Sequence, residues 1–212
     1  NELEAKPLGG VPITSLTSKT NILIKSANGN WIKGTTRTAN NNTDDRIVYV
    51  DLDDKAPIKL PAPIVFDLEK FCIRDNNIHM RAIDDLAGCS SILSALFQIA
   101  ETKVRANVYA IFTRAEEVGL IGARLICENK ILPINTTIVS VEASPLISGV
   151  LQGEGPIIRI GDKQTTFNYE AEQILVKSLK NLQSQRPDFK AQRKLMDGGT
   201  CEGTAFNIEG YK

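Results

Sequence analysis

Five acidic side chains follow the apolar segments of this sequence at places where they could act together. They are Asp84, Asp85, Glu116, Glu117 and Glu142. Two groups come after apolar runs of strand composition, at 108–112 and 137–141, and the third opens a long helical pattern. Ligands of open α/β sheets bind beyond the carboxyl ends of the strands, so we expect these acids to meet at one edge. Acids in such proximity repel one another unless a positive charge lies between them.

A metal ion is the usual positive charge in such a place. Carboxylate oxygens bind Zn²⁺, Mn²⁺, Co²⁺ and Mg²⁺, and a bridging Asp can hold two ions roughly 3.5–4 Å apart. Each acidic pair also has a purely structural interpretation. Asp84-Asp85 would favour the positive end of a helix, and Glu116-Glu117 would be an exposed loop pair. The occurrence of all three groups together favours the metal site.

The first 80 residues predict a small all-β module with an N-terminal connector over 1–20. Asn28-Gly29 is a two-residue hairpin signal. Three asparagines at 40–42 predict an exposed loop. Further short strands are expected at 47–50, 64–66 and 78–80, where β-branched and aromatic residues gather. The composition of 1–80 therefore indicates a β module.

After residue 80 the apolar period changes from two to about 3.6 residues. Helices are expected over 85–102, 119–129 and 169–183, with buried strands at 107–112 and 137–141 between them. This alternation is typical of an α/β layer with a mainly parallel sheet. The predicted organisation is thus a β module over 1–80 and an α/β domain over 81–212.

Composition excludes several classes of protein. The 212 residues include 25 Lys and Arg against 25 Asp and Glu, whereas nucleic-acid binders concentrate basic residues on one face. No apolar run in the sequence predicts a membrane span. The four cysteines are widely spread and form no CxxC pair, which favours reduced thiols in a cytoplasmic protein.

Three segments resemble, in order, the metal-site motifs of the co-catalytic metallo-aminopeptidases: Ala82-Ile83-Asp84-Asp85-Leu86-Ala87-Gly88-Cys89, Phe112-Thr113-Arg114-Ala115-Glu116-Glu117-Val118-Gly119-Leu120 and Val141-Glu142-Ala143. The most similar branch holds the tetrahedral dodecameric, glutamyl and deblocking aminopeptidases. Gly153-Glu154-Gly155-Pro156 and Gly198-Gly199-Thr200 resemble the family's Gly-x-Gly-Pro turn and Gly-Gly-Thr loop. The family also inserts a small β-barrel into its α/β catalytic domain, where this chain has its β module.

The resemblance implies a role for each acid. Asp84 would bridge two divalent ions, and its peptide bond to Asp85 would be cis. Glu116 would be the general base, Glu117 would bind one ion and Glu142 the other, and Asp85 would orient the site. The implied reaction is hydrolysis of N-terminal residues from peptides with two Zn²⁺ ions, or with Co²⁺ or Mn²⁺. The resemblance further implies a homo-oligomer assembled partly through the β module.

The sequence departs from the family pattern in its histidines. The family uses two metal-ligating histidines, whereas this chain has only His79, at a position where the motif asks for no ligand. We therefore expect a chain truncated at both ends that holds metal weakly. The alternative is a degenerate, non-catalytic relative that acts as an assembly or binding subunit. Glu142 replaces the Asp usual in this branch, and Cys201 replaces an Asp of the Gly-Gly-Thr-Asp loop.

A different enzyme class remains open from the carboxylates alone. Glu116 and Glu142 would flank a glycosidic bond in a sugar hydrolase. The low aromatic content of 6% argues against this, since sugar sites often present aromatic platforms. The sequence leaves open the preferred N-terminal residue of the substrate, the native metal and the size of the oligomer.

Overall fold

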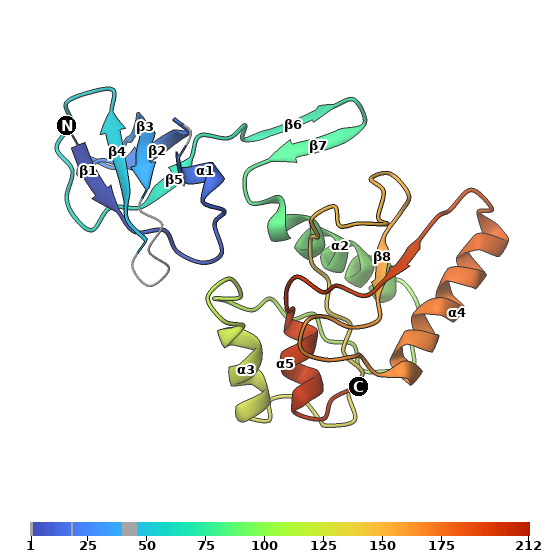
Figure 1. Cartoon of the computed structure of the whole chain (residues 1–212). Coiled ribbons are helices and arrows are strands. Elements are labelled where there is room, and N and C mark those ends of the chain that lie inside the picture. Colours follow the sequence, from blue (N-terminus) through green and yellow to red (C-terminus); the bar gives the residue numbers. More distant parts are fainter. Residues whose placement is uncertain (1, 18, 40–45) are drawn as a thin grey trace. The chain divides into compact units, whose positions relative to one another are not determined.

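The chain forms two compact units, Asn1–Arg81 and Ala82–Lys212 (Figure 1). The structure is a computed structural model that describes residues 2–17, 19–39 and 46–212. The loop predicted at 40–42 lies outside the described residues. Each unit has its own buried apolar cluster.

The first unit is built on a five-stranded antiparallel sheet with the order β1-β4-β3-β2-β5. Its strands are β1 (Glu2–Ala5), β2 (Asn21–Lys25), β3 (Trp31–Ala39), β4 (Val48–Leu52) and β5 (Ile64–Phe66). The predicted hairpin around Asn28-Gly29 is confirmed, because β2 pairs with β3, but its loop is longer than two residues: Lys25 pairs with Trp31, and residues 26–30 form the connection. Within this loop Gly29 has a positive φ of 82°, and its N–H donates to the carbonyl oxygen of Ser26 at 3.0 Å. Alternate residues of β2 and β4 are buried and form the core.

A second hairpin completes this unit. It pairs β6 (Phe71–Arg74) with β7 (Asn77–Met80) across Asp75 and Asn76, which both have positive φ. The connector prediction for 1–20 is wrong in part, because β1 pairs with β4 and a short helix, α1 (Thr14–Thr17), lies in the same stretch. In the described residues β1 and β5 are the two edges of the sheet, so hydrogen bonding gives an open sheet rather than a closed barrel.

The second unit contains the four longer helical segments of the chain that the structure describes: α2 (Ile83–Ala100), α3 (Ile121–Glu128), α4 (Tyr169–Gln185) and α5 (Glu202–Ile208). The first three confirm the predicted helices, whereas α5 was not expected. The side chain of Asn168 begins α4 by accepting a hydrogen bond from the N–H of Ala171 at 3.0 Å. Helices α3 and α5 lie side by side (Figure 1) and share a core that contains Leu120, Ala123 and Phe206.

The prediction of strands at 107–112 and 137–141 is wrong for this chain. Both segments have no regular secondary structure, and no neighbouring strand pairs with them among the described residues. The parallel pairing that the structure does contain joins β8 (Ile157–Arg159) to β9 (Gln192–Lys194). The unit is therefore mixed α/β, without the predicted extended parallel sheet in its described part.

Helix α2 is long and apolar enough to cross a membrane by length and composition alone. Core helices of α/β proteins share these properties. Its first turn carries Asp84 and Asp85, and most of its side chains are exposed in this chain. The sequence-based expectation of no spanning segment therefore overlooked one helix that meets the minimum length and hydropathy.

Candidate active site

The second unit contains an open cavity of about 880 Å³, and the predicted acids lie on its wall. The carboxylic acids on its wall are Asp84, Asp85, Glu116, Glu117, Glu142 and Glu202. Among the described residues that line the cavity, Arg159 is the one basic side chain. All five acids singled out in the sequence thus lie on one cavity, and a sixth acid and an arginine join them.

Asp84 and Asp85 reach the cavity from the start of α2. Their peptide bond is cis, as the resemblance implies, and both residues have non-helical backbone angles. The Oδ1 of Asp85 accepts a hydrogen bond from the N–H of Gly88 at 3.0 Å, so Asp85 caps the regular part of the helix. An ideal Cβ at position 88 would lie 2.6 Å from Oδ1 of Asp85 and closer still to Oδ2. Only glycine leaves room for this cap.

Glu116 and Glu117 lie on a tight turn before α3. The carbonyl oxygen of Glu116 accepts hydrogen bonds from the N–H groups of Gly119 and Leu120, at 3.1 and 2.9 Å. The N–H of Gly122 donates a hydrogen bond to the carbonyl oxygen of Arg114 at 3.0 Å. A Cβ added at position 122 would lie 2.7 Å from this oxygen of Arg114. The close approach of α3 to its own entry loop therefore fixes the two acids at the cavity.

The surroundings of Glu116 favour its protonated form. Burial and the neighbouring negative charges raise the pKa of Glu116 from 4.5 to about 7. Burial has the largest effect on this pKa. The negative charges of four other acids follow, in order of decreasing effect: Glu117, Glu142, Glu202 and Asp84. A carboxylate with a pKa near neutrality is well suited to accept and return a proton.

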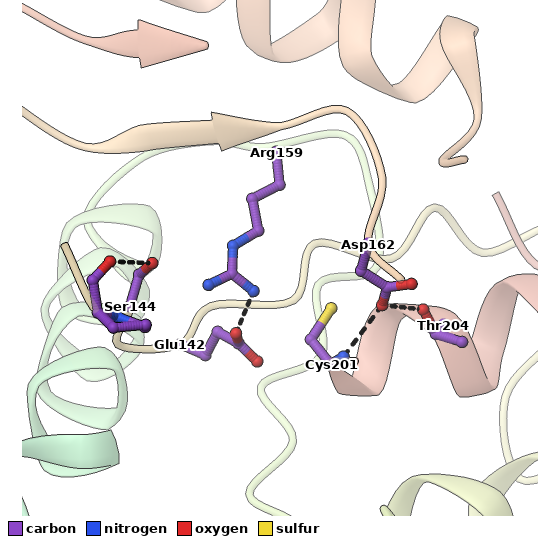
Figure 2. A network of polar contacts seen from close by, with 7 residues as sticks. Glu142, Ser144, Arg159, Asp162, Cys201 and Thr204 are labelled. Atoms are coloured by element: carbon purple, nitrogen blue, oxygen red, sulfur yellow. Dashed lines mark hydrogen bonds and ion pairs between the residues drawn. The ribbon is translucent and has the colours of Figure 1, made fainter. Parts of the chain in front are cut away.

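Glu142 differs from the other acids because it has a cationic partner. Its Oε1 forms an ion pair with Nη1 of Arg159, and Figure 2 shows the arginine extending from β8 toward it. Burial nevertheless raises the pKa of Glu142, and Arg159 opposes this effect. The sequence reasoning missed Arg159, whose only signal was a basic residue at the end of the apolar pair Ile157-Ile158.

Two further acids that the sequence reasoning missed, Glu202 and Asp162, accept hydrogen bonds from segments that flank the cavity. The hydroxyl of Thr113 donates a hydrogen bond to Oε1 of Glu202 at the start of α5. The buried carboxylate of Asp162 accepts hydrogen bonds from the N–H of Cys201 at 3.1 Å and from the hydroxyl of Thr204 (Figure 2). Asp162 thereby holds the loop that precedes α5, and Gly198, Gly199 and Thr200 of that loop line the cavity.

Two residues raised by the sequence have no catalytic surroundings. His79 is exposed on β7 of the first unit, opposite Cys72. Cys201 is 2% exposed, and burial raises the pKa of its thiol, so it is not an activated nucleophile. All four cysteines are unpaired thiols, two of them buried and two half-buried. The expectation of reduced thiols stays a prediction.

The acids suit a divalent cation in kind. Carboxylates are the oxygen ligands that such ions take, and the burial and mutual repulsion that raise the pKa of Asp84 and Glu142 would be relieved by a positive charge. In the described residues, however, no three His, Cys, Asp or Glu side chains lie close enough together to form a metal-binding group. The types of donor atom therefore suit a divalent cation, but their spacing in this structure does not form a metal-binding group in the described residues, and Glu142 is paired with Arg159 instead.

Solved structures of similar fold include two aminopeptidases from archaea and a protein that is a dodecamer in the asymmetric unit. Aminopeptidase APDkam598 from Desulfurococcus kamchatkensis is 21% identical, with a TM-score of 0.73 over 97% of this chain and 61% of that chain. The TET aminopeptidase from Thaumarchaeota archaeon SCGC AB-539-E09 is 18% identical, with a TM-score of 0.70 over 94% and 61%. The structure of PhTET1-12s, a dodecamer in the asymmetric unit, is 20% identical, with a TM-score of 0.66 over 94% and 62%.

The chain is shorter than these relatives. It spans 61–62% of the length of the three solved chains. A curated protein from Acetivibrio thermocellus is 25% identical over 142 residues, which are 64% of this chain and 40% of that protein. Residues 3–212 match the family described as M42 glutamyl aminopeptidase. The chain therefore belongs to the M42 glutamyl aminopeptidase family.

Proposed function

We propose that this protein is a metal-dependent aminopeptidase that removes N-terminal residues from peptides. The observation that carries the proposal is the position of Glu116, whose pKa is raised to about 7 in a cavity lined by five other acids. Membership of an aminopeptidase family supports the same activity. A general base with a pKa close to the working pH is what hydrolysis by activated water requires.

The acids around Glu116 divide into ligands and supports. Asp84 would bridge two divalent ions, Glu117 would bind one of them and Glu142 the other. When bound, the ions would lower the pKa of water and polarise the scissile carbonyl. Asp85 would orient the site through its hydrogen bond to Gly88. Zinc is the expected metal, and cobalt and manganese accept the same ligands.

Glu116 would act twice in one turnover. Its carboxylate first accepts a proton from the attacking water, and it then returns this proton to the amine that leaves. The negative charges of Glu117, Glu142 and Glu202 strengthen the first step because they raise the affinity of Glu116 for a proton. The excess of negative charge on the wall also favours the positively charged amino terminus of a peptide.

The setting of the enzyme follows from the same family membership. We infer a cytoplasmic homo-oligomer that acts on peptides and binds neither nucleic acid nor membrane. The dodecameric structure of PhTET1-12s supports the oligomer, and four unpaired cysteines support a reducing compartment. The balanced charge supports the absence of a nucleic-acid partner.

An aminopeptidase assay on the longest natural form that contains this chain tests the proposal. The protein is stripped of metal, Zn²⁺, Co²⁺ or Mn²⁺ is added back, and a panel of aminoacyl chromogenic substrates is tested. Metal should restore activity, and Glu116→Gln should reduce kcat by a factor of about 10²–10⁴. The matched control is Glu128→Gln, which changes an exposed acid at the end of α3.

The results separate the enzyme from its rival. Restored activity that is lost in Glu116→Gln and kept in Glu128→Gln supports the proposal and reports the preferred substrate residue. A folded protein that remains inactive with every metal and substrate would instead favour the non-catalytic assembly or binding subunit.

A further inference from the structure

Arg159 occupies a singular position in the cavity. It is the one basic side chain among the described lining residues, against six acids. Its side chain is 13% exposed and that of Glu142 is 25% exposed, so the ion pair between them is partly shielded from water. The backbone of Arg159 is fixed by the parallel pairing of β8 with β9, opposite Lys194. The guanidinium therefore has a fixed position in the cavity wall.

Arg159 shares the cavity with a second proposed ligand. Both Arg159 and Asp84 line it, and the guanidinium contacts Glu142 directly. The guanidinium therefore lies among the acids that are proposed to hold the metal.

We propose that Arg159 is an internal counter-ion that competes with a divalent cation for Glu142 and thereby sets the metal affinity of the cavity. The inference rests on the proposed function, which assigns Glu142 as a ligand. A carboxylate that already pairs with a guanidinium must release it, or share its oxygens with it, before it can bind a metal ion. Two positive charges next to one carboxylate also repel each other, and more strongly where water is partly excluded.

The opposite role for Arg159 makes the opposite prediction. Partners of metal ligands often orient them, and the loss of such a partner weakens metal binding by about 10–100-fold. A competing counter-ion, when removed, strengthens binding instead. The sign of the change in metal affinity therefore separates competition from orientation.

The test is a calorimetric titration of the longest natural form that contains this chain, stripped of metal, with Mn²⁺ alone, checked by the electron paramagnetic resonance signal of free Mn²⁺. Arg159→Gln should bind Mn²⁺ about tenfold more tightly than the unmodified chain, a change of the size that partners of ligands produce. Arg159→Lys keeps the charge and should bind with close to the original affinity. Arg193→Gln is the matched control, because Arg193 of β9 pairs with Glu172 of α4 and does not line the cavity.

A second pair of variants links the effect to Glu142. In the Glu142→Gln background, the substitution Arg159→Gln should no longer strengthen Mn²⁺ binding, because the carboxylate for which Arg159 and the metal ion compete is absent. Mn²⁺ should also raise the melting temperature of Arg159→Gln more than that of the unmodified chain. Circular dichroism of each metal-free variant establishes that the fold is retained, and Arg159→Lys supplies the comparison if Arg159→Gln does not fold.

Each result decides the inference. Unchanged or weaker Mn²⁺ binding by Arg159→Gln contradicts the proposal that Arg159 competes with the metal ion. Arg159→Lys contradicts it as well if it binds Mn²⁺ as tightly as Arg159→Gln does. Failure of both the unmodified chain and Arg159→Gln to bind Mn²⁺ overturns it too, and it removes the metal from the proposed function. If the protein has metal-dependent activity but Arg159→Gln does not change its affinity for Mn²⁺, the proposed function is retained and only the counter-ion role of Arg159 is rejected.

Discussion

The hydroxyl of Thr113 donates a hydrogen bond to the carboxylate of Glu202, so the loop that carries Glu116 is joined to the first turn of α5. The two residues are 89 positions apart in the sequence. The contact holds a negative charge close to Glu116, where it adds to the effects of burial, Glu117 and Glu142 on the pKa. Helix α5 therefore contributes to the acid–base behaviour of the cavity.

Glu202→Gln should lower the pKa of Glu116, because one of the charges that raise it is removed. The titration of Glu116, followed by carbon-13 NMR in the metal-free chain, should move to lower pH. Glu209→Gln, at the other end of α5, is the control and should leave the titration unchanged. A titration of Glu116 that does not move in Glu202→Gln would contradict the electrostatic link.

The raised pKa of Glu116 also predicts how stability depends on pH. Between about pH 4.5 and 7, Glu116 remains protonated in the folded chain but is ionised in the unfolded chain. The folded state therefore binds more protons, so this group makes the free energy of unfolding fall as the pH rises through that range. Urea unfolding at several pH values should show a smaller decrease for Glu116→Gln than for Glu128→Gln. Equal slopes in the two variants would reject a raised pKa.

Gly88→Ala should destabilise the second unit although alanine favours helices. The higher helix propensity of alanine would stabilise α2 by about 1 kcal/mol. However, the new Cβ would lie 2.6 Å from Oδ1 of Asp85 and would displace this capping carboxylate. The net loss in the free energy of unfolding is expected to be about 1–2 kcal/mol. Gly203→Ala in α5 is the control, since its nearest contact would be an ordinary 3.4 Å to Cys201. Thermal unfolding should rank Gly88→Ala well below Gly203→Ala.

Asp162→Asn should loosen the loop before α5. The two oxygens of the buried carboxylate accept hydrogen bonds from the N–H groups of Gln164, Thr165 and Cys201 and from the hydroxyl of Thr204. An amide in this place would bring an N–H donor toward other donors, at a cost of about 1–3 kcal/mol. Urea unfolding of Asp162→Asn measures the loss. Asp188→Asn, which changes an exposed acid, should be within about 0.5 kcal/mol of the unmodified chain.

Local patterns in the sequence predicted much of the fold. Asn28-Gly29 specified its hairpin, and the 3.6-residue period specified α2, α3 and α4, because each signal depends on neighbours along the chain. The segments 107–112 and 137–141 have strand composition but no strand partner in the described residues. Strand pairing depends on residues elsewhere in the chain, so composition alone could not decide it.

The acids of the cavity were predictable for a different reason. Glu142 follows an apolar segment directly, Glu116 lies four residues after Phe112, and a resemblance to known motifs covered both positions. Arg159, Asp162 and Glu202 lie on elements whose approach to the cavity depends on tertiary packing. A single charged residue after a short apolar pair, or at the start of a short helix, is common on protein surfaces. The sequence therefore gave no reason to select these three.

The segments 107–112 and 137–141 line the cavity without a hydrogen-bonded ladder in the described part of the chain. An amide hydrogen that has no acceptor exchanges with solvent deuterium through small local openings, whatever the global stability. We expect these segments to label early in deuterium exchange and α4 to label late. Ile138 is the exception, because its N–H donates to the carbonyl oxygen of Lys212 at 2.6 Å. Ile111 and Ile138 instead anchor the two segments by packing on the core between α3 and α5. Shortening either isoleucine would then disturb the site without changing any acid.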